Sequence, residues 1–71
     1  MKENYKILRL ELLDCEGRLL DRGSTEKVDV EEIVETVRCF FNKVPAATEI
    51  AVSDKLYNTL FTCERRFFVK E

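Results

Sequence analysis

The side chains that could do chemistry in this chain include carboxylates, cysteines and arginines, but its 71 residues include no histidine. Histidine is the usual base that activates a serine or cysteine nucleophile, so neither a Ser–His nor a Cys–His pair can form. Glu31 and Glu35 have the spacing of neighbours on a helix surface, but nothing in the sequence indicates the burial that a catalytic carboxylate needs. The two glycines, Gly17 and Gly23, do not form a phosphate-binding loop. The sequence therefore predicts a protein that is not an enzyme and uses no cofactor.

The three cysteines, Cys15, Cys39 and Cys63, are evenly spaced, but their flanking residues do not extend the spacing into a repeat. An odd number of cysteines cannot close completely into disulfides, and no two lie close enough in the sequence for a zinc site. Cys39 falls opposite Val30 on a 3.6-residue helical turn, which predicts an exposed thiol. Such a thiol could respond to redox conditions or link a partner, although a tolerated surface cysteine is the simpler interpretation. The sequence predicts no metal site.

The one basic cluster consists of Arg65, Arg66 and Lys70, and Phe67 and Phe68 lie between its members. Arginines interleaved with aromatic rings can bind single-stranded nucleic acid by charge and stacking. The same residues could form an edge strand in which core phenylalanines alternate with solvated arginines. The net charge of −2 favours the second interpretation, since nucleic-acid binders are normally basic.

The composition is that of one small folded domain spanning residues 1–71, with 45% hydrophobic and 37% charged residues. No apolar run approaches the roughly 20 residues of a membrane span, so no membrane partner is expected. The first residues do not resemble a secretion signal, which predicts a cytoplasmic protein.

The elements that must position these side chains begin with a helix over Val30 to Val44. Asp29 is placed to cap its first turn, with Glu32 reaching back in a capping box, and Val28 and Ile33 are placed to staple the entering chain. Pro45 stops the helix. Its predicted apolar face comprises Val30, Ile33, Val34, Val37, Phe40, Phe41 and Val44.

The remaining elements are predicted from alternation and turn residues. Leu8, Leu10 and Leu12 alternate within a first strand, and Gly17 suits the hairpin loop that follows. The predicted elements are strands over Tyr5–Asp14, Arg18–Ser24 and Glu49–Ser53, a short helix from Ser53 or Asp54 to Thr62, and a fourth strand over Arg65–Lys70. The order ββαβαβ predicts an α+β two-layer sandwich, with a four-stranded mixed or antiparallel sheet and both helices on one face.

A sheet covered on one face leaves Tyr5, Ile7, Leu13 and Phe68 (or Phe67) as a possible apolar patch on the other. Single exposed hydrophobic residues are ordinary, so the patch could also be plain surface. The sequence predicts a small non-enzymatic protein-interaction module that binds its partner through the open sheet face or an edge strand. The partner could be a second copy of the chain, which would make the protein a homodimer. The alternatives are a nucleic-acid-associated protein and an accessory regulator or inhibitor from a phage or mobile element.

Overall fold

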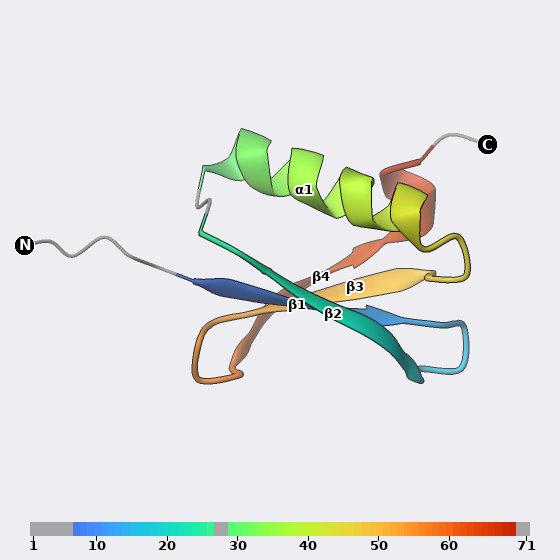
Figure 1. Ribbon diagram of the computed structural model, residues 1–71, viewed down its shortest axis with the longest axis horizontal. Helices are drawn as coiled ribbons and strands as arrows, with labels where there is room; N and C mark the ends of the chain where they lie inside the picture. The colour runs from blue at the N-terminus through green and yellow to red at the C-terminus, as the bar shows by residue number, and fades with distance from the viewer. Residues whose placement is uncertain (1–6, 27–28, 70–71) are drawn as a thin grey trace, which may run out of the picture.

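The computed structural model describes residues 7–26 and 29–69, in which one α-helix lies across one face of a four-stranded antiparallel sheet (Figure 1). The strand order is β2-β1-β3-β4. The elements are β1 (Leu8–Leu13), β2 (Leu19–Thr25), α1 (Val30–Lys43), β3 (Glu49–Ser53), β4 (Thr59–Glu64) and a 3₁₀ turn, η1 (Arg65–Phe67). The α+β class is confirmed, whereas the described chain follows the order ββαββ and has no second α-helix.

The core lies between α1 and the face of the sheet that carries Leu8, Leu10 and Leu12. The alternation in β1 buries these three leucines, whereas the residues between them are only partly buried. Register places Leu10 opposite Val52 and Leu12 opposite Ile50, so β3 adds its own apolar residues to the same face. Phe41 from α1 is fully buried among them. The predicted inward face of the first strand is therefore confirmed.

The helix begins and ends close to the predicted positions, at Val30 and Lys43. Asp29 occupies the N-cap position with extended backbone angles, but its carboxylate makes no capping hydrogen bond to the described first turn. Its carbonyl instead accepts the amide of Ile33, at 2.9 Å. Val28 lies outside the described residues, so the predicted staple is not seen. Val30 is 75% exposed and does not join the core.

The predicted short helix over residues 53–62 is wrong, because Asp54 starts a tight hairpin turn instead. Its Oδ1 accepts the backbone amides of Leu56 and Asn58, each at 2.9 Å. Side-chain acceptors of this kind compete with helical hydrogen bonding for backbone amides. Tyr57 then takes a positive φ of 67°, which reverses the chain into β4.

The predicted fourth strand over Arg65–Lys70 is also wrong. The last strand is β4, and the chain continues into η1, where the amide of Phe68 donates to the carbonyl of Arg65 at 2.9 Å. Lys70 lies outside the described residues. Where the chain leaves the sheet, Nη1 of Arg65 donates to the carbonyl oxygen of Phe41 in α1 at 2.8 Å and to that of Ala47, in the loop after α1, at 3.3 Å.

Candidate functional site

The single described helix covers the sheet unevenly. A helix with its side chains is about 10–12 Å wide, and strands are spaced by about 4.8 Å, so one helix covers about two of four strands. Toward β2, the helix approaches closely: a Cβ atom added to Gly23 would lie 2.4 Å from Cζ of Phe40. Toward β4, Phe61 remains 43% exposed although it faces the helix side of the sheet with its partner Val52. The helix side of β4 is therefore only partly covered, since Cys63 is buried there and Phe61 is not.

A hollow of about 130 Å³ lies between α1 and β4. We call it the α1–β4 groove, and it is lined by Val30, Ile33, Val34, Val37, Phe61, Cys63 and Phe68. All of these residues are apolar or a thiol. Among the lining residues, Phe68 also packs against the core, with its ring centroid 6.0 Å from that of Phe41. The groove therefore offers an apolar surface beside the last strand of the sheet.

β4 is an edge strand, since its register is with β3 on one side only. The amide of Arg65 donates to the Thr48 carbonyl at 2.9 Å, so the trans peptide bond points the Glu64 carbonyl away from β3. Along a strand, the backbone N–H and C=O groups of every second residue point to the same side, so those of Thr62, like those of Glu64, point away from β3. The stretch from Thr59 to Cys63 carries no charge, whereas the opposite edge, β2, contains Asp21-Arg22-Gly23. Charge discourages strand pairing, so β4 is the more receptive edge.

The predicted apolar patch is not assembled as a unit. Ile7 is exposed and Leu13 half-buried, near opposite ends of β1, and Arg9 and Glu11 separate them on the same face. Phe68 lies on the other side of the sheet, against α1 and the core. Tyr5 lies outside the described residues. The position of Phe68 corrects the prediction, and it follows from the reversal of the chain after β4.

The basic cluster is also divided. Arg65 is partly buried and donates to carbonyls at the end of α1, whereas Arg66 is exposed and pairs with Glu64, with Nε 2.8 Å from Oε1. Arg38 from α1, which the sequence pattern did not include, lines a surface hollow of about 490 Å³ together with Arg66 and Phe67. Arg38 in turn pairs with Glu35 at 3.5 Å. The arginines of this region therefore already have protein partners.

The three cysteines form no disulfide and differ in their exposure to solvent. Cys15, in the β1–β2 loop, and Cys39, on the outer face of α1, are exposed, whereas Cys63 is buried in β4. Burial raises the pKa of the Cys63 thiol and so disfavours its thiolate. Among residues 7–26 and 29–69, no group of three or more histidine, cysteine or acidic side chains could hold a metal ion.

Arg9 and Tyr57 form a contact that sequence reasoning missed. Arg9 faces away from the core on β1, and its Cζ lies 4.7 Å from the centroid of the Tyr57 ring. Tyr57 is the described non-glycine residue with positive φ, in the β3–β4 turn. The sequence does contain a pattern that could have indicated this contact. The loops 14–18 and 54–58 both begin with an aspartate, and Tyr57 occupies the position in the second loop that Gly17 occupies in the first.

Comparison of the chain with protein-family models, with curated proteins and with solved structures returns no match. The function therefore has to be argued from the chain's own geometry. In the part of the chain that the structure describes, no helix is both long enough and apolar enough to cross a membrane.

Proposed function

We propose that this protein is a non-enzymatic interaction module that associates with a second copy of itself through β4. The observation that carries the proposal is the uncharged stretch of the β4 edge from Thr59 to Cys63, which lies directly beside the apolar α1–β4 groove. Strand addition at such an edge combines main-chain hydrogen bonds with burial of alternate side chains.

The sequence of β4 is compatible with antiparallel pairing of two copies about a two-fold axis at Thr62. The outward peptide groups of Thr62 in the two copies then bond to each other, as in a two-fold symmetric interface. Phe61 of one copy faces Cys63 of the other on the groove side, and Leu60 faces Glu64. No like charges oppose one another in this register, and both grooves become more buried. The dimer would also enlarge the small apolar core that 71 residues can form.

The proposal is tested by the mass of the protein in solution over a wide concentration range with reductant present. We expect a concentration-dependent dimer that Phe61→Lys abolishes. Leu20→Lys on β2 is the matched control, because Leu20 is 40% exposed and Phe61 43% exposed, on the two opposite edge strands. A wild-type protein that remains monomeric at all concentrations, or equal effects of the two lysine variants, would contradict the proposal.

A second variant tests the backbone component. Thr62→Pro removes an outward amide without breaking a bond to β3, because proline is tolerated at such edge positions. We expect this variant to remain folded and monomeric. A dimer that survives Thr62→Pro would show that β4 pairing is not the mode of association.

The proposal includes a cytoplasmic setting, in which the three unpaired cysteines would stay reduced. The runner-up function is binding of single-stranded nucleic acid at the hollow formed by Arg38, Arg66 and Phe67. It is supported by Phe67, which is 71% exposed, and by Arg66, whose Cζ lies 4.8 Å from the centre of that ring. Binding to a single-stranded oligonucleotide that weakens steeply with salt would favour it, and salt-independent or absent binding would remove it.

A further inference from the structure

Arg9 differs from the other five arginines of the chain, all of which lie in the described residues. Arg18, Arg22, Arg38 and Arg66 each pair with a carboxylate, and Arg65 donates to backbone carbonyls. Within the described structure, Arg9 has a ring contact but no hydrogen bond or ion pair, and its Nε is buried without a partner. A buried donor without an acceptor is unfavourable, so Arg9 Nε gains from a ligand group that brings an acceptor.

The surroundings of Arg9 hold further polar groups. Register places Ser24 of β2 and Ser53 of β3 opposite Arg9 on the open face of the sheet. A hollow of about 50 Å³ lies beside the guanidinium, lined in part by Arg9, Glu11, Arg22 and Tyr57. Since one water molecule takes about 30 Å³ of liquid, the hollow can receive a carboxylate-sized group. Glu11 lies nearer to Arg22, at 3.8 Å, and makes no ion pair with Arg9 in the described structure.

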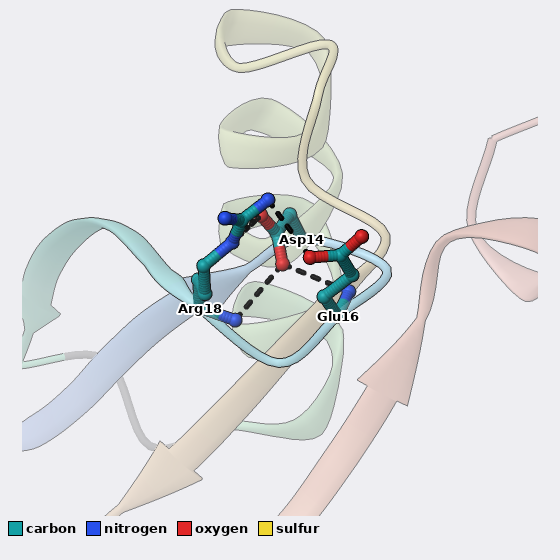
Figure 2. A network of polar contacts seen from close by, with 3 residues as sticks. All are labelled: Asp14, Glu16 and Arg18. Atoms are coloured by element: carbon teal, nitrogen blue, oxygen red, sulfur yellow. Dashed lines mark hydrogen bonds and ion pairs between the residues drawn. The ribbon is translucent and has the colours of Figure 1, made fainter.

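The conformation of Tyr57 supports a role for this ring beyond surface filling. The loops 14–18 and 54–58 share the same bonds: the aspartate Oδ1 accepts the amides two and four residues later. Figure 2 shows this arrangement around Asp14, Glu16 and Arg18. The first loop has Gly17 at its left-handed position, with φ of 81°, whereas the second has Tyr57 there. Left-handed backbone is unfavourable for tyrosine, and such positions cluster at functional sites.

We propose that Arg9, held against the Tyr57 ring, binds an oxyanion, either a carboxylate or a phosphate group. A guanidinium presents its N–H groups as a planar fork that matches two oxygens of either anion. The stacked ring fixes the plane of the fork, and the anion supplies the acceptor that the described structure does not. This site lies on the sheet face opposite the α1–β4 groove and is independent of the self-association proposed above.

The test is an NMR titration of the full chain with sodium phosphate and, separately, with sodium acetate, with ionic strength held constant by sodium chloride. We expect saturable shifts of the Arg9 Nε–H and of the amides of Ser24, Ser53 and Tyr57, with a dissociation constant on the order of 1–10 mM. The anion that saturates at the lower concentration identifies the ligand chemistry. If neither anion gives saturable shifts at these residues, the proposal is wrong.

Variants separate the site from general attraction of anions. Arg9→Gln should remove saturation, and Arg9→Lys, which keeps the charge and the aliphatic stem, should weaken binding by about tenfold because it lacks the fork. Tyr57→Gly should weaken binding while preserving the loop, since glycine suits the backbone there. Glu11→Gln should tighten binding by removing a nearby negative charge. Arg18→Gln is the control and should leave binding unchanged; a loss there equal to that of Arg9→Gln would overturn the assignment.

Discussion

Replacement of Gly23 by alanine tests how closely the helix packs against β2. The added methyl would lie 2.4 Å from Cζ and 2.9 Å from Cε1 of Phe40, well inside the ~3.5–4.0 Å of a normal carbon contact. The ring would have to move by about 1 Å, and overpacking of this kind costs about 1–3 kcal/mol. Alanine in a strand recovers about 0.5–1 kcal/mol of backbone entropy relative to glycine. The net expectation is a loss of about 1 kcal/mol in the free energy of unfolding.

The assay is urea and thermal unfolding of Gly23→Ala, Phe40→Leu and the double variant. Leucine lacks the Cε and Cζ atoms that make the close contacts, so Gly23→Ala should become neutral or stabilising in the Phe40→Leu background. The coupling energy of this double-mutant cycle should reach about 1 kcal/mol or more. In a chain of this size, 1 kcal/mol corresponds to a shift in Tm of about 4–8 °C.

Gly17→Ala is the matched control, because it is the same substitution but its expected loss of stability comes from the backbone conformation and not from a steric contact. No atom lies within 4 Å of a Cβ at Gly17, but its φ of 81° is unfavourable for alanine, which costs about 1–2 kcal/mol. This loss should be the same in the wild-type and Phe40→Leu backgrounds. The reasoning about helix placement is refuted if Gly23→Ala is neutral in the wild-type background, or if Phe40→Leu fails to relieve its cost.

Three further predictions concern single side chains. Arg65→Lys should lower the free energy of unfolding by about 1–2 kcal/mol in urea denaturation, because lysine cannot reproduce the guanidinium bonds to the carbonyls at the end of α1. The hydrogen bond from the Asn58 amide is the main cause that lowers the pKa of the Asp54 carboxyl below its ordinary value. The stability that the ionised Asp54 contributes is therefore complete above about pH 4–5 and is lost as the pH falls through the lower folded-state pKa. Asp54→Asn should show a smaller pH dependence of stability below pH ~5, measured as Tm against pH. Cys39 should react with a thiol-modifying reagent much faster than Cys63 in the native protein, as followed by mass spectrometry, and equal rates would contradict the burial of Cys63.

The parts of the fold that the sequence predicted correctly are those set by local patterns. Asp29 and Pro45 bracket the helix, and the alternating leucines of β1 set both the strand and its buried face. These signals act within a few residues, although the Asp29 carboxylate does not make the capping bond predicted for it. The α+β class and the central elements could therefore be predicted.

The parts that could not be predicted depend on competition or on distant contacts. Leu56, Tyr57, Leu60 and Phe61 have helical spacing, but the segment becomes a turn and an edge strand. The Asp54 carboxylate binds the amide of Asn58, which in a helix capped at Asp54 would bond to the Asp54 carbonyl. Arg65 binds the carbonyl of Phe41, on a helix 24 residues earlier in the chain. Periodicity carries no information about such a partner. Phe68 was therefore expected on the open face, whereas it packs against the core on the helix side.

The two hairpin loops show how a local rule can indicate a site when it is broken. Asp14 and Asp54 organise the same turn, and the first loop meets its backbone requirement with Gly17. If the second loop were only a connection, glycine at position 57 would serve it equally well. Tyrosine there adds backbone strain, and its ring lies over the one described arginine that lacks an ionic or hydrogen-bonding partner. The strain at Tyr57 and the unpartnered Nε of Arg9 therefore have a common explanation if the open face binds an anion beside the Arg9–Tyr57 contact.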